Sequence, residues 1–196
     1  MQFFYDKEWL KNYGICFMRH RSLSEYTVFL PLFLMPAVNL AIYGISFSTL
    51  GILQMVFYSS VEEILYRGFL LSVFTRQYRI NILPGIISTS LFFALMHMVN
   101  IYEGVTALYA LVQGICAGAA GFCFAVLTCR ERSIFPGAVI HSLINITSLG
   151  AAGQAVHRLE SRRLDLSETH AAVFIIVAAV YLIYGIWIYR REMSGR

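Results

Sequence analysis

The chain has 196 residues, 58% of them hydrophobic, with a formal net charge of +4 and a mean hydropathy of +0.66. These values exclude a water-soluble domain of this size, in which apolar residues make up about half of the chain. They are typical of an integral membrane protein. The positive charge indicates membrane topology and contact with anionic lipid, so we expect no nucleic-acid partner.

The hydrophobic segments set the expected architecture. Residues 1–22 are rich in aromatic and basic side chains, lack the features of a secretory signal peptide, and are expected to lie along the cytoplasmic interface. A spanning helix needs about 20 mainly apolar residues. Six windows approach that length, the third and fifth being the shortest: 28–47, 52–75, 82–99, 104–129, 134–149 and 171–189.

Prolines and small residues mark the ends and contacts of these windows. Pro31 and Pro36 are expected to start or bend the first helix, because proline removes an amide donor. Pro84 and Pro136 fall in first turns, where proline is tolerated. The fourth window carries small residues that let helix backbones approach closely: Gly114, Gly118 and Gly121. Segment 151–169 is polar, and is expected to be an extramembrane loop or an interfacial helix.

The basic residues predict the orientation. With a cytoplasmic N-terminus, eleven of them fall in inside segments and three outside, as the positive-inside rule requires. The inside set is Lys7, Lys11, Arg19, Arg21, Arg76, Arg79, Arg130, Arg132, Arg190, Arg191 and Arg196, and the outside set is Arg158, Arg162 and Arg163. The sequence therefore predicts an all-α, polytopic transmembrane bundle of about six spans, one domain over 1–196, with both termini cytoplasmic.

Charged residues inside the second window indicate a site. Glu62, Glu63 and Arg67 occur within an otherwise apolar segment. A charged group near the bilayer centre costs on the order of 2 to 15 kcal/mol, so such a cluster is a candidate functional site by default.

Two further windows carry polar faces. His97 follows Phe93 by four residues in the third window, and Asn145 follows His141 by four in the fifth. Residues three or four apart share a helix face. Because lipid cannot satisfy such groups, we expect these faces to converge with the glutamates on one another or on a water-filled cavity.

The resulting set of side chains suits hydrolysis of a peptide bond by water. One of Glu62 and Glu63 serves as the base, because a carboxylate withdrawn from water beside another acid accepts a proton more readily. Glu63 is the better partner for Arg67, given their i,i+4 spacing. His141 and Asn145 are candidate donors to the oxyanion, and His97 holds the water or shuttles a proton.

Two alternatives remain open from the residues alone. The buried charges could hold helices together or carry protons in a non-enzymatic membrane protein, such as a small transporter or an immunity factor. Glu62, His97 and His141 also form a plausible zinc set. The chain lacks an HExxH motif, and the guanidinium and carboxamide suit anion stabilisation better, so we expect no cofactor and keep zinc as the less favoured alternative.

The motifs resemble one known family. Residues 62–67 match EExxxR, residues 93–97 match FxxxH and residues 141–145 match HxxxN, in that order. This arrangement is similar to the CAAX-protease and bacteriocin-processing (CPBP or Abi) family of intramembrane endopeptidases. Each motif is weak alone, but three intact motifs in order are specific.

The resemblance implies residue roles. Glu62 is then the water-activating base, Glu63 and Arg67 its supporting pair, His97 its partner, and His141 with Asn145 the oxyanion donors. It implies a glutamate-dependent protease, although the family also carries an older description as metalloproteases.

The resemblance also implies a setting for the enzyme. The motif-bearing core spans 52–149. The compact frame favours a prokaryotic plasma-membrane protein acting on a membrane-associated peptide or protein. A CAAX protein, a bacteriocin or signalling-peptide precursor and a C-terminal sorting tag all remain candidate substrates, and the sequence does not specify an oligomeric state.

Overall fold

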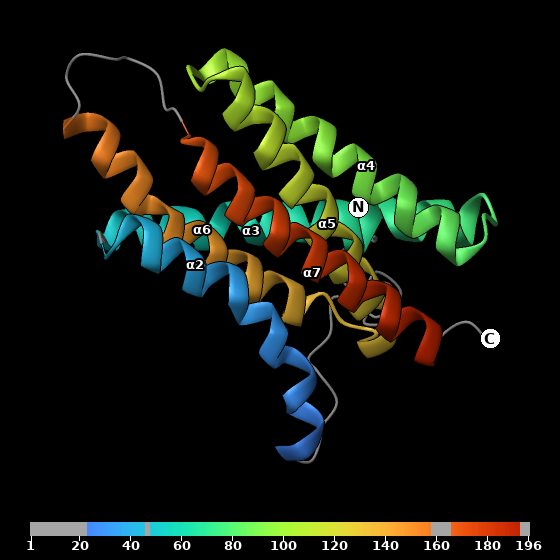
Figure 1. The fold of residues 1–196 in the computed structure, drawn as a ribbon. Helices are drawn as coiled ribbons and strands as arrows, with labels where there is room; N and C mark the ends of the chain where they lie inside the picture. Colours follow the sequence, from blue (N-terminus) through green and yellow to red (C-terminus); the bar gives the residue numbers. More distant parts are fainter. Residues whose placement is uncertain (1–22, 46–47, 158–165, 193–196) are drawn as a thin grey trace.

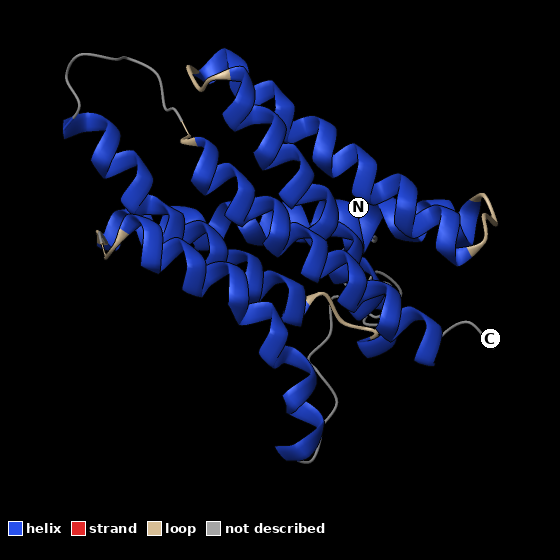
Figure 2. Cartoon of the chain, in the orientation of Figure 1, coloured by secondary structure: helices blue, strands red, loops and turns tan. Residues whose placement is uncertain are grey.

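The structure, a computed structural model, describes residues 23–45, 48–157 and 166–192, and every regular element in these ranges is a helix (Figures 1 and 2). The helices are η1 (Leu23–Phe33), α2 (Leu34–Tyr43), α3 (Thr49–Glu63), η2 (Ile64–Leu70), η3 (Val73–Gln77), α4 (Ile82–Met98), η4 (Val99–Glu103), α5 (Ala107–Glu131), α6 (Phe135–His157) and α7 (Glu168–Glu192). The predicted all-α class is confirmed for the described residues.

Helix boundaries follow the local sequence signals. Pro84 and Pro136 lie in the first turns of α4 and α6, as predicted. Pro31 instead lies within η1, a 3-10 helix, and Pro36 in the first turn of α2, so the first window is divided between two helical types. Ser48 caps α3 by accepting a hydrogen bond from the Gly51 amide at 3.0 Å, which satisfies one of the donors that a helix start leaves open.

Three of the described helical segments are long and apolar enough to cross a membrane: Ile82–Tyr102, Ala107–Glu131 and Glu168–Glu192. A shorter apolar segment covers Thr27–Tyr43. These findings indicate a membrane protein, and the count of six spans stays a prediction. The predicted interfacial segment 1–22 lies outside the described residues. Of segment 151–169, residues up to His157 continue α6, and 158–165 also lie outside the described part.

Helix α5 is the centre of the bundle, packed between α4 and α7, while α6 packs against α2 and α3. The small residues predicted for close packing lie at the α4 interface. A Cβ atom at Gly114 would lie 3.2 Å from the Ala94 carbonyl oxygen, and one at Gly118 would lie 3.2 Å from the Ala94 Cβ. Because these two glycines have no side chains, α4 packs close to α5.

The second window folds as one continuous helical run that changes type. Helix α3 is α-helical as far as Glu63, and the chain then continues as the π-helix η2, which contains Arg67. A π-helix inside an α-helical run is rare and often lies at a functional site. This change of helical type directly after the two glutamates was not predicted from the sequence.

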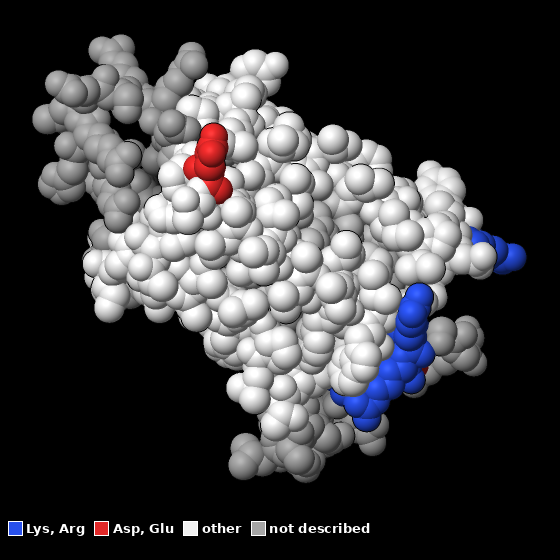
Figure 3. Space-filling view, viewed as in Figure 1, with Lys and Arg blue, Asp and Glu red and all other residues white. Residues whose placement is uncertain are grey.

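One end of the bundle is basic. Figure 3 shows arginines gathered at the end where α7 finishes, with an acidic residue at the opposite end. Arg130, in the last turn of α5, contacts Glu192 at the end of α7, and Arg191 lies 5.2 Å from the centre of the Trp187 ring. Aromatic and basic side chains are typical of a helix end at a membrane surface.

Candidate active site

Glu63 is a fully buried carboxylate that binds two cationic or polar partners. Its side chain has no exposed surface, and its Oε1 accepts a hydrogen bond from Arg67 Nη1 at 2.8 Å. The same oxygen lies 3.0 Å from His141 Nδ1 on α6. Because an ionised carboxylate only accepts, Nδ1 carries the hydrogen and donates to Glu63. Glu63 thus joins α3, η2 and α6 through charge-assisted hydrogen bonds.

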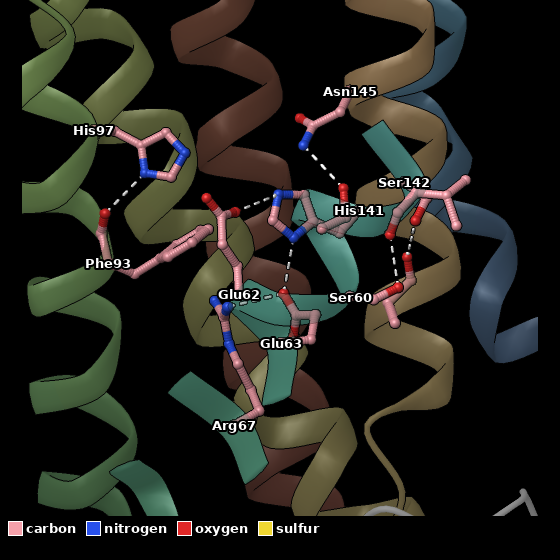
Figure 4. A network of polar contacts seen from close by, with 12 residues as sticks. Ser60, Glu62, Glu63, Arg67, Phe93, His97, His141, Ser142 and Asn145 are labelled. Atoms are coloured by element: carbon pink, nitrogen blue, oxygen red, sulfur yellow. Dashed lines mark hydrogen bonds and ion pairs between the residues drawn. The ribbon is translucent and has the colours of Figure 1, made fainter. Parts of the chain in front are cut away.

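Glu62 occupies a different environment from its neighbour. Its side chain is 37% exposed, and Oε2 lies 3.4 Å from His141 Nε2, the opposite ring nitrogen from the one that Glu63 holds. The Glu62 carboxylate lies between the imidazole rings of His141 and His97 (Figure 4) and interacts electrostatically with His97. Of these two adjacent glutamates, Glu62 is therefore the one with exposed side-chain surface.

His97 is fixed by its own helix. Its Nδ1 lies 2.9 Å from the carbonyl oxygen of Phe93, one turn earlier on α4. A carbonyl oxygen only accepts, so Nδ1 carries the hydrogen and the other ring nitrogen of the neutral imidazole is an acceptor. The Phe93 ring contacts both histidines edge-on, with ring centres 4.5 Å from His97 and 5.6 Å from His141. The Phe93 ring therefore packs against both imidazole rings and sets the distance between them.

The Arg67 guanidinium is enclosed by aromatic rings and by the backbone of α5. Its Cζ lies 4.2 Å from the centre of the Phe93 ring and 5.8 Å from that of Phe124. A Cβ atom at Gly121 would lie 2.7 Å from Arg67 Nη2, so no larger residue fits there while the guanidinium stays in place. Gly137 likewise leaves room for Glu63, because a Cβ atom at this position would lie 3.1 Å from Glu63 Oε2.

Asn145 lies one turn beyond His141 on α6, and its Nδ2 donates to Ser59 Oγ on α3 at 2.9 Å. Asn145, His141 and His97 all line one cavity of about 130 Å³, together with apolar residues of α2, α5 and α7. The six residues predicted from the sequence are therefore near one another. In Figure 4, Glu63 and Arg67 lie below His141, and Asn145 lies above it on the cavity wall.

A zinc site requires at least three ligands that converge on one point. Within 23–45, 48–157 and 166–192, no group of three or more His, Cys, Asp and Glu side chains has a geometry that could hold a metal ion. His141 Nδ1 donates to Glu63 and His97 Nδ1 to a carbonyl oxygen, so the Nε2 atoms are the ones that could ligate a metal, as is usual for metal-bound histidines. Because the described residues assemble no such ligand set, we derive no chemical step through a metal, and the expectation of no cofactor stays a prediction.

Several residues of the site were not found by sequence reasoning. Ser59 precedes Glu63 by four residues, which places it on the same face of α3, and this spacing was the available signal. Gly121 and Gly137 make room for Arg67 and Glu63 from two other helices. Gly137 precedes His141 by four residues and so shares its face of α6, whereas nothing in the spacing of Gly121 relative to the motifs indicates its role.

Together these features define a class: a helical membrane protein that encloses paired carboxylates, two imidazoles and a carboxamide beside a cavity. The family model described as "Type II CAAX prenyl endopeptidase Rce1-like" matches residues 44–147, just over half of the chain, and the chain belongs to this family. The resemblance drawn from the three motifs is thereby confirmed. The comparisons with curated proteins and with solved structures found no match.

Membership fixes the activity at the family level. The protein is a CAAX-type intramembrane protease, a peptide hydrolase whose substrates are membrane-associated peptides or proteins. The match covers all three motifs, from Glu62 to Asn145, and leaves most of the first predicted window and the whole of α7 outside.

Replacing Gly121 with alanine tests the packing around Arg67. The new Cβ displaces the guanidinium from Glu63, so we expect a lower thermal unfolding midpoint in detergent and at least about a tenfold loss of peptide cleavage, since small displacements in a site are costly. Gly118→Ala is the matched control, because it adds the same methyl group one turn away against Ala94. Equal behaviour of the two variants would contradict the assigned role of Gly121.

Proposed function

We propose that the protein is a glutamate-dependent intramembrane endopeptidase in which Glu62 activates the attacking water. The observation that carries this proposal is the difference between the two adjacent glutamates. Glu63 is fully buried and held by Arg67 and His141, whereas Glu62 is 37% exposed and faces both histidines. A base must reach the proton that it removes, and Glu62 meets that requirement.

The position of the water follows from the hydrogen-bonding roles. Glu62 and the Nε2 atom of neutral His97 are both acceptors, so a water between them donates one hydrogen to each and directs a lone pair toward the substrate carbonyl carbon. Glu62 takes the first proton as the C–O bond forms. The same proton then goes to the leaving amine as the C–N bond breaks, which leaves Glu62 ionised for the next cycle.

The oxyanion that forms in this step needs hydrogen-bond donors directed at the former carbonyl oxygen. Asn145 lines the cavity and offers amide N–H groups. His141 donates through Nδ1 to Glu63, so donation from Nε2 as well requires the doubly protonated imidazolium. Donors preorganised in this way supply a large share of catalysis in acyl transfer.

The substrate reaches this site within the membrane. We place the protein as a multi-pass protein of a prokaryotic plasma membrane, acting on a C-terminal CAAX segment, a peptide precursor or a sorting tag. Large apolar side chains are exposed on η2 and α4 near the site, including Leu65 and Leu95. Such a surface suits lipid, and a substrate anchored in the bilayer is already concentrated beside it.

Replacement of Glu62 with glutamine removes the base and nearly preserves the shape of the side chain. We expect cleavage to fall by at least about 100-fold, with the unfolding midpoint unchanged. The assay uses fluorogenic peptides in lipid vesicles: a farnesylated CAAX peptide, its unprenylated counterpart and any precursor peptide encoded next to the gene.

The control for this substitution is Glu168→Gln, which neutralises an exposed acidic residue in the first turn of α7. This variant should cleave as the wild type does. Full cleavage by Glu62→Gln would contradict the mechanism. A change in proton movement across vesicles, without any peptide cleavage by the wild type, would favour the non-enzymatic alternative.

Metal dependence is tested separately. Because the mechanism needs no metal, we expect purified protein to contain zinc far below one equivalent and to keep its activity after treatment with a chelator. Elemental analysis and cleavage assays on the same sample measure both quantities. Stoichiometric zinc that is lost together with activity would support the alternative set of Glu62, His97 and His141.

We also propose six spans with both termini in the cytoplasm. The arginines at the ends of α5 and α7, on the basic end of the bundle, support this orientation. A fluorescent protein fused after residue 196 should fluoresce, and alkaline phosphatase fused there should be inactive. Alkaline phosphatase fused after residue 163 should be active. The reverse pattern would contradict the orientation.

A further inference from the structure

Two polar contacts between α3 and α6 lie one helical turn apart. Glu63 contacts His141 at 3.0 Å, and Ser59, four residues earlier on α3, contacts Asn145, four residues later on α6, at 2.9 Å. From one contact to the other, the residue number falls on α3 and rises on α6, so the two helices run antiparallel here. Residues four apart on one helix face are separated by about one turn. The HxxxN motif of α6 is therefore matched by Ser59 and Glu63 on α3.

Ser59 is placed to act on Asn145 rather than on solvent or on lipid. Its side chain is fully buried, and α3 and α6 are in direct contact along this face. Its neighbour Ser60 behaves differently, because that hydroxyl donates to the Val56 carbonyl oxygen of its own helix at 2.7 Å. Of these two adjacent serines, Ser59 is the one that contacts a residue of the cavity wall.

A hydroxyl group can hold a carboxamide in either orientation. Ser59 Oγ accepts from Asn145 Nδ2, and it can equally donate to Oδ1 when the amide is rotated by half a turn. At least one amide N–H is left over in both cases. Without this contact the side chain of Asn145 has further rotamers available, and its N–H loses a fixed direction toward the cavity.

We propose that Ser59 is a positioning residue of the protease, which holds the Asn145 carboxamide where it donates to the oxyanion. This inference rests on the proposed function, since it gives Asn145 the same role. Ser59 does not touch the reacting atoms and acts only through Asn145. It lies outside the three motifs that identified the site.

The test compares cleavage by Ser59→Ala with that by Ser60→Ala. We expect Ser59→Ala to lower kcat about 10- to 100-fold, less than the 10²- to 10³-fold typical of deleting an oxyanion donor, with little change in KM. Ser60→Ala should keep the wild-type kcat. Ser59→Cys controls for packing, because a thiol fills the space but bonds weakly. It should lose as much activity as Ser59→Ala.

A double-mutant cycle separates positioning from general packing. In an Asn145→Ala background, Ser59→Ala should cost almost nothing, because its target is already gone. An undiminished loss in that background, or recovery of activity in Ser59→Cys, would overturn the inference. Wild-type cleavage by Ser59→Ala alongside an inactive Glu62→Gln would overturn this inference alone, whereas an active Glu62→Gln would overturn the proposed function.

Discussion

The burial of the Glu63 carboxylate is the constraint on which the site depends. An ionised carboxylate removed from water is stable only with close, well-oriented partners, and here both come to a single oxygen, from Arg67 at 2.8 Å and from His141 at 3.0 Å. These partners belong to η2 and α6, so the pairing fixes how the second and fifth hydrophobic segments lie against each other. The glycines at 121 and 137 are consequences of the same pairing, since α5 and α6 must leave space for the charged groups.

That constraint also separates the chemistry of two adjacent glutamates. On a helix, neighbouring residues point about 100° apart, so Glu63 turns into the bundle, whereas Glu62 faces His97 and His141 and keeps exposed surface. Glu63 is held by two donors and orients the His141 ring, and the Nε2 atom of that ring then faces Glu62. The buried Glu63 thus orients, through His141, the surroundings of the more exposed Glu62. In many enzyme sites, residues that do not react orient the reacting groups in this way.

Much of this arrangement was predictable from sequence, for physical reasons that can be named. The helical class follows from hydropathy, and the Glu63–Arg67 pair from its i,i+4 spacing. The expectation that polar faces converge follows from the cost of exposing them to lipid. The π-helix η2 was not predictable, because hydropathy does not distinguish helical types. Nor was Ser59, since a single serine in an apolar helix usually bonds to its own backbone, as Ser60 does. The cavity walls on α2 and α7 lie outside all three motifs.

The central claim is that Glu63 holds the structure while Glu62 performs the chemistry, and the thermal unfolding midpoints of the two single glutamine variants test it most directly. Glu63→Gln leaves the buried Arg67 without its counter-charge, a loss of about 3 to 5 kcal/mol, and should lower the midpoint by at least several degrees. Glu62→Gln should have the same unfolding midpoint as the wild type. Equal midpoints for the two variants, or a lower midpoint for Glu62→Gln, would contradict the division of roles.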